Sequence, residues 1–123
     1  MWVEAVLGMA KIARLTGRQV FAAVYTEGRS WSNNLVALRA LPNDLGSSRY
    51  GFAVGKRLGG AVDRNKVRRR LREAVRHTPV KEGWDIILVA RHNAAMADYD
   101  TLKKATEELL SRAQLLDNRI GKA

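Results

Sequence analysis

Residues 51–74 read GFAVGKRLGGAVDRNKVRRRLREA and join an apolar stretch to a strongly basic one through a pair of glycines. Apolar side chains alternate along residues 49–56, which predicts a strand. One face of this strand carries Tyr50, Phe52 and Val54. Gly59 and Gly60 end the strand and begin a helix, which we expect to run to about His77. The sequence therefore predicts a strand, a glycine turn and a basic helix in direct succession.

The predicted helix separates apolar from cationic side chains on a helical wheel. A narrow arc faces the core and carries Val67, Leu71, Ala74 and Val75. A cationic flank lies beside it, with Arg64, Arg68 and Arg72 at four-residue steps, extended by Asn65, Arg69 and Arg76. Stacked arginines repel one another unless anions neutralise them, and guanidinium groups bind phosphates through paired hydrogen bonds. The pattern favours a polyanion site over a merely solvated helix face.

Asn65 in this flank is open to two interpretations. Its side chain offers both donors and an acceptor, which suit a ribose hydroxyl or a neighbouring arginine. The alternative is a structural contact with nearby backbone.

Positive charge is concentrated around this helix. The chain of 123 residues has a formal net charge of +10 and an isoelectric point near 10.7. Residues 49–76 hold ten Lys and Arg side chains against two acids, and therefore carry +8 of that charge. A polyanionic partner, most often a nucleic acid, is the usual reason for such a local patch.

Composition excludes several classes of protein. The chain has no cysteine, which removes disulfides, thiolate metal sites and a cysteine nucleophile. It has no run of about 18 apolar residues, so we expect no membrane span. The first residues, Met1 to Glu4, lack the basic region that opens a signal peptide. We therefore expect a cytoplasmic protein.

The titratable side chains predict no catalytic residue and no metal ligand. His77 and His92 are the two histidines, and neither belongs to a metal-ligand or general-base pattern. Asp98 and Asp100 are better explained as helix caps than as ligands of Mg²⁺.

The residues before the quoted segment supply a further helix and strand. Thr16 and Gln19 fit a capping box and predict a helix over residues 17–27. Residues 34–41 alternate and predict a strand. We expect this strand to form an antiparallel hairpin with the strand over residues 49–56.

The residues after the segment complete an α+β fold, a small sheet (the hairpin plus a central strand) packed with helices. The apolar run over residues 84–91 predicts the buried central strand. Asp98 or Asp100 caps a last helix. We interpret residues 1–12 as an extension of uncertain structure, and residues 13–123 as a single domain.

The quoted segment resembles the signature of the bacterial ribonuclease P protein subunit. That signature joins a strand with a basic end, a Gly-x-Ala-Val turn, and an Arg-Asn-basic helix that continues into Arg-Arg-x-Leu-Arg. Residues 59–62, 64–66 and 68–72 match these parts in order and without gaps. Weaker similarity extends over roughly residues 14–116.

The resemblance implies a protein that binds a large catalytic RNA. The ribonucleoprotein of this family removes the 5′ leader from precursor tRNA, and its RNA performs the hydrolysis with Mg²⁺. We expect no protein-bound cofactor and no protein partner. In this family the basic helix sits in an unusual left-handed β-α-β crossover. Carried over by position, the RNA-binding residues are Lys56, Arg57, Arg64, Asn65, Lys66, Arg68, Arg69 and Arg72.

The resemblance also implies a cleft between the first helix and the sheet that holds the single-stranded leader. Phe21 and Tyr25 fall at matching aromatic positions, and aromatic rings stack on bases of any sequence. The alternative is that both rings belong to the core. Arg39 stands where family members often carry an apolar or aromatic residue, so stacking there would be partly replaced by a phosphate contact.

Two other functions stay open at this point. One is a basic ribosome-associated or RNA-chaperone protein without a cleavage role, and the other is a nuclease that acts without RNA. The ordered signature from Lys56 to Arg72 favours the ribonuclease P subunit, since a generic basic protein has no reason to carry it.

Overall fold

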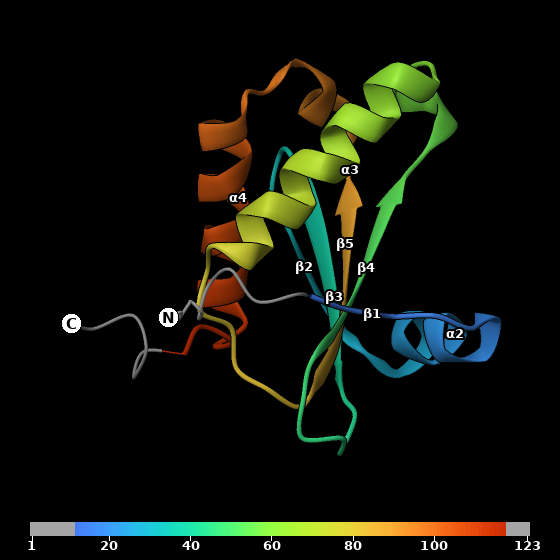
Figure 1. Cartoon of the computed structure of the whole chain (residues 1–123), viewed down its shortest axis with the longest axis vertical. Helices are drawn as coiled ribbons and strands as arrows, with labels where there is room; N and C mark the ends of the chain where they lie inside the picture. The colour runs from blue at the N-terminus through green and yellow to red at the C-terminus, as the bar shows by residue number, and fades with distance from the viewer. Residues whose placement is uncertain (1–11, 118–123) are drawn as a thin grey trace.

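The structure is a computed structural model that describes residues 12–117. Its centre is a five-stranded mixed sheet with strand order β1-β4-β5-β3-β2 (Figure 1). The strands are β1 (Ala13–Arg14), β2 (Arg29–Ser32), β3 (Val36–Pro42), β4 (Arg49–Val54) and β5 (Trp84–Ala90). The helices are α2 (Arg18–Glu27), α3 (Ala61–Arg76) and α4 (Tyr99–Arg112), with the 3-10 turns η1 (Lys56–Leu58) and η2 (His92–Met96). The α+β class is confirmed, and the expected extension lies, except for Ile12, outside the described residues.

The basic helix α3 connects two neighbouring parallel strands. β4 and β5 pair in parallel from Arg49 with Asp85 to Val54 with Ala90. In Figure 1 both strands point upward, α3 crosses the near face of the sheet, and β5 lies to the left of β4. A connection of this form is left-handed, whereas about 98% of such connections are right-handed. The crossover that the resemblance implied is therefore present.

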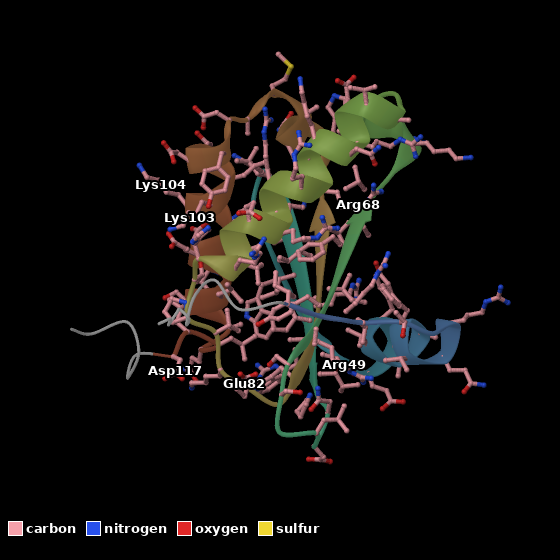
Figure 2. The ribbon with its side chains drawn as sticks, viewed as in Figure 1. Arg49, Arg68, Glu82, Lys103, Lys104 and Asp117 are labelled. Carbon is pink, nitrogen blue, oxygen red and sulfur yellow. The ribbon has the colours of Figure 1, made fainter. Side chains whose placement is uncertain are left out.

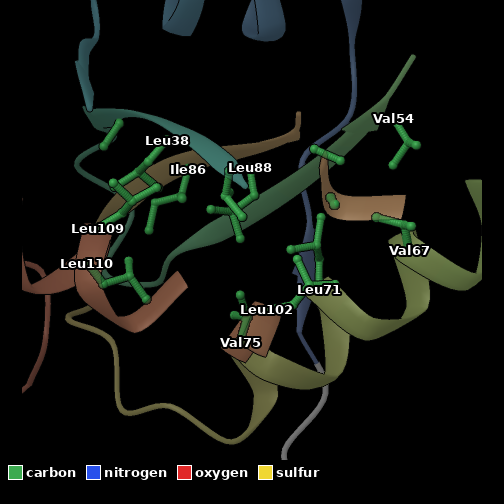
Figure 3. Close-up of a cluster of buried hydrophobic side chains, with 14 of the residues drawn as sticks. Leu38, Val54, Val67, Leu71, Val75, Ile86, Leu88, Leu102, Leu109 and Leu110 are labelled. Carbon is green, nitrogen blue, oxygen red and sulfur yellow. The ribbon is translucent and has the colours of Figure 1, made fainter. Parts of the chain in front are cut away.

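The main core lies between the sheet and the pair of helices α3 and α4 (Figure 3). The arc predicted for α3 is confirmed, because all four of its side chains are buried: Val67, Leu71, Ala74 and Val75. They meet Leu102, Leu109 and Leu110 of α4 above Ile86 and Leu88 of β5. Each fully buried leucine or isoleucine contributes about 1.5–3 kcal/mol, so this layer fixes the position of α3 on the sheet.

The helix α2 covers part of the opposite face of the sheet. Side chains alternate along a strand, so Ile87 points away from Ile86 and Leu88. There it forms a second buried cluster with Leu15 and Val24. The sheet therefore carries helices on both faces, with α3 and α4 on one and α2 on the other.

The helix boundaries agree with those predicted from the sequence to within a few residues, but one predicted N-cap is wrong. Asp98 caps α4 as expected, because its carboxylate accepts a hydrogen bond from the Thr101 N–H at 2.9 Å. The capping box at Thr16 is wrong. α2 begins one residue later, at the N-cap Gly17, and no side chain caps it. Gly17 has a φ of 100°, a conformation that glycine adopts readily and threonine does not.

The expected hairpin between residues 34–41 and 49–56 is also wrong. β3 and β4 do not pair with each other, because β5 lies between them, antiparallel to β3 and parallel to β4. β5 is apolar on both faces, so the central position of the sheet buries it most completely. The hairpin that does form joins β2 to β3, with Arg29 opposite Ala40.

A partly buried ion pair joins the first residue of β4 to the second residue of β5. Arg49 donates from Nε and Nη2 to the two carboxylate oxygens of Asp85, at 2.8 and 2.6 Å. Asn43 donates to the same carboxylate at 2.9 Å. Burial on its own opposes the charged form of Asp85, but these hydrogen bonds outweigh it and hold the pKa of this carboxyl below its ordinary value of 3.8.

We expect Asp85→Asn to lower the free energy of unfolding at neutral pH by about 1.5–3 kcal/mol, since Arg49 loses a charged acceptor. The depressed pKa means that the carboxylate stabilises the fold above pH 3.8, and that this contribution is lost as the pH falls through the folded-state value. Chemical denaturation from neutral to strongly acid pH measures both effects. An equally steep acid loss of stability in the variant would contradict this assignment.

Candidate nucleic-acid interface

Three arginines of α3 occur at four-residue steps on the side of the helix that faces the edge of the sheet. Arg68, Arg72 and Arg76 line a hollow of about 730 Å³ beside β1 and β4. Figure 2 labels Arg68 on this side of α3, above the strand β4. We call this hollow the edge pocket, and its walls also include Ile12, Arg14, Phe21, Tyr50, Gly51 and Phe52.

Arg69 does not share this side of the helix. It lines a smaller hollow, of about 350 Å³, together with Arg70, Glu73, His77 and Tyr99. Tyr99 is the first residue of α4, so Arg69 lies at a hollow beside α4 and not at the edge pocket. The single cationic flank expected from the sequence is therefore wrong at Arg69. The remaining candidates of the basic segment, Lys56, Arg57 and Lys66, are exposed on η1 and α3.

Asn65 contacts a neighbouring arginine, which is one of the two interpretations that the sequence left open. Its amide oxygen accepts a hydrogen bond from Arg68 Nη1 at 2.7 Å. The contact uses one N–H group of the guanidinium and leaves the others to face the edge pocket. Next to this pair, the buried Nε of Arg64 has no hydrogen-bond acceptor among the described residues.

The two aromatic candidates of α2 lie in different surroundings. Tyr25 is 41% exposed, and the guanidinium of Arg39 lies 5.0 Å from its ring centre. Arg39 also donates to the Tyr25 carbonyl at 3.2 Å. Phe21 instead packs against the sheet, where a Cβ added to Gly51 would come within 2.7 Å of its ring. Tyr25 and Arg39 therefore form an accessible ring-and-cation pair, whereas Phe21 is mainly a packing residue.

Two members of the edge pocket escaped the sequence analysis as site residues. Arg14 lies on β1, a strand of two residues that is too short to give a periodic signal. Phe52 lies below α3, with the Arg72 guanidinium 5.8 Å from its ring centre. The shared face of Tyr50, Phe52 and Val54 was the available signal, because the basic helix that follows this strand partly covers that face. Burial raises the pKa of Tyr50, so its phenol stays neutral.

Other kinds of site find little support within residues 12–117. In that part of the chain no group of three or more His, Asp or Glu side chains is arranged to hold a metal ion. None of the helices described there is long and apolar enough to span a bilayer. The arginines around α3 are the main chemical feature of the described residues, which form a small basic α+β domain.

A family model described as Ribonuclease P matches residues 9–114, so the chain belongs to the ribonuclease P protein family. The chain is 42% identical over 103 residues to the ribonuclease P protein component of Dehalococcoides mccartyi, an alignment that covers 84% of this chain and 86% of that protein. It is likewise 42% identical over 111 residues to the component from Symbiobacterium thermophilum, with 88% and 96% covered.

Solved structures show the same fold. The RNase P protein of Staphylococcus aureus superposes with a TM-score of 0.78 at 29% identity, and the match covers 87% of this chain and all of that one. The RNase P protein from Thermotoga maritima gives a TM-score of 0.75 at 30% identity, with 80% and 96% covered. The family that the basic segment predicted is confirmed.

Proposed function

We propose that this chain binds the catalytic RNA of ribonuclease P and the 5′ leader of precursor tRNA, and so promotes the 5′ maturation of tRNA. The observation that carries the proposal is the row of arginines on α3, of which Arg72 is exposed and Arg68 and Arg76 are partly exposed. This helix folds from the segment that matches the family signature. In this proposal the RNA, with its Mg²⁺, performs the hydrolysis in the cytoplasm. The protein supplies positively charged groups and no catalytic side chain.

The α3 row is suited to the phosphates of a folded RNA. Arg68 and Arg72 stand one helical turn apart, and each guanidinium offers paired donors to a phosphate. The Asn65 contact fixes the direction of the Arg68 guanidinium, which lowers the entropy lost on binding.

The leader is assigned to the α2 side of the sheet. Tyr25 offers an accessible ring, and Arg39 sets a cation beside it. This pair provides a stacking surface for a base and a charge for the adjoining phosphate, neither of which depends on the leader sequence. The arrangement suits a protein that must accept many different leaders.

Cleavage of precursor tRNA by separated components tests the proposal. The assay compares the protein alone, the ribonuclease P RNA alone, and both together, at low Mg²⁺. We expect efficient cleavage only in the mixture. Cleavage by the protein alone would identify a self-sufficient nuclease, and a mixture no faster than the RNA alone would favour an RNA chaperone without a cleavage role.

Arg68→Ala should weaken binding of the ribonuclease P RNA and leave the fold intact, since the side chain lies outside the buried arc of α3. Loss of one phosphate contact lowers the magnitude of the negative slope of log K against log salt by roughly one unit. Lys104→Ala is the matched control, because it removes one exposed cation from α4 (Figure 2). Equal slopes for both variants would remove Arg68 from the interface.

Tyr25→Ala should weaken binding of precursor tRNA to the assembled holoenzyme by about 1–3 kcal/mol, the usual loss for one stacking ring. Mature tRNA lacks the leader, so its affinity should stay the same, and so should assembly with the RNA. Binding titrations with both tRNAs measure the difference. A loss of equal size for precursor and mature tRNA would show that Tyr25 does not read the leader.

A further inference from the structure

The edge pocket combines two kinds of surface that a row of phosphate contacts does not need together. Four arginines line it, namely Arg14, Arg68, Arg72 and Arg76. None of its other described lining residues is acidic. Its floor is apolar and aromatic, with Ile12, Tyr50 and Phe52 packed against the main core from the outside. A phosphate pairs with the arginines but gains nothing from this floor.

The register of the sheet places these groups on one face. Arg14 is the parallel partner of Tyr50, so both side chains point to the face that α3 covers. Phe52 follows Tyr50 at the next position on that face and is half-buried. The Arg72 guanidinium lies 5.8 Å from the Phe52 ring centre, so a cation and a ring meet at the floor.

The pocket is also hollow rather than convex. Its volume of about 730 Å³ lies within the range of about 300–1,000 Å³ that holds small ligands. A regular RNA duplex presents phosphates on a convex surface and keeps its bases stacked inside. A ligand that uses both the arginines and the floor must therefore bring a flat apolar group together with a phosphate.

We propose that the edge pocket binds one unpaired nucleotide of the partner RNA, with its base against Phe52 and the Arg72 guanidinium and its flanking phosphates on Arg14 and Arg68. This inference rests on the proposed function, and it adds a base-binding site on the α3 face to the phosphate row. Bases that leave the helical stack bind to aromatic rings and guanidinium planes in this way. The site differs from the Tyr25 surface: Phe21 of α2 borders the pocket, but Tyr25 and Arg39 do not line it.

Two RNA hairpins of equal length test the proposal with the full chain. One carries a single bulged 2-aminopurine nucleotide in its stem and the other is fully paired. We expect Phe52→Leu to weaken binding of the bulged hairpin about tenfold, the loss of one stacking contact, and to leave the paired hairpin unchanged. Phe52→Tyr keeps the ring and should keep the affinity. The fluorescence of the bulged base should fall on binding to the parent and not to Phe52→Leu.

Trp31→Leu is the matched control. Trp31 is a half-buried ring on β2, at the other edge of the sheet, with the Arg29 guanidinium 5.5 Å from its ring centre. This variant should bind both hairpins as the parent does. Arg14→Gln is a second probe, and it removes no packed ring because Arg14 is exposed. This variant should also weaken binding of the bulged hairpin more than binding of the paired one.

If Phe52→Leu lowers the affinity for the two hairpins equally, or lowers neither, the proposed nucleotide pocket is overturned. Neither result touches the proposed function, which is judged by cleavage of precursor tRNA. Adenosine monophosphate serves as a competitor to separate an RNA-borne nucleotide from a free one. Displacement of the bulged hairpin by AMP at concentrations comparable to the RNA would assign the pocket to free nucleotides, and resistance to AMP supports the RNA.

Discussion

The burial of β5 on both faces is the constraint on which the other elements depend. Ile86 and Leu88 pack under α3 and α4, while Ile87 packs under α2, so the strand is covered above and below. It also has a strand on each side, β3 and β4. Because β4 must lie parallel to β5, the chain between them has to cross the sheet, and α3 is that crossing. The basic helix is thus held in place by the core of the domain.

On α3, the side chains that pack in the core and the cations available for binding lie on different sides of the helix. The buried arc, represented by Val67 and Leu71, attaches it to the sheet and needs no charge. The cations lie off this arc, so their replacement leaves the core unchanged. The left-handed crossover then sets Arg68 and Arg72 over the β4 edge, where Phe52 and Arg14 approach them. In this topology a cationic row and an apolar floor come together at one edge of the sheet.

The sequence predicted the elements whose periodicity is strong and whose neighbours are close in the chain. The extent of α3, the central position of residues 84–91 and the cap at Asp98 are of this kind. Strand pairing was predicted wrongly, because nearness in sequence suggested a hairpin whereas burial of β5 decided the order. Arg14 lay on a two-residue strand with no pattern of its own. Arg68 and Arg69 line different hollows because different elements pack beside the two sides of α3. A helical wheel does not show which elements pack beside the helix.

The position of β5 in the chain has a consequence for how the domain is made. The central strand is the last of the five in sequence, and both of its neighbours precede it. Until residues 84–90 leave the ribosome, β3 and β4 have no strand between them, and the apolar arc of α3 has no complete surface to cover. Contacts between segments so far apart in sequence form slowly, since the chain must first close long loops. The basic segment is therefore synthesised before the strand that completes its sheet, and α3 can pack fully only once β5 has emerged.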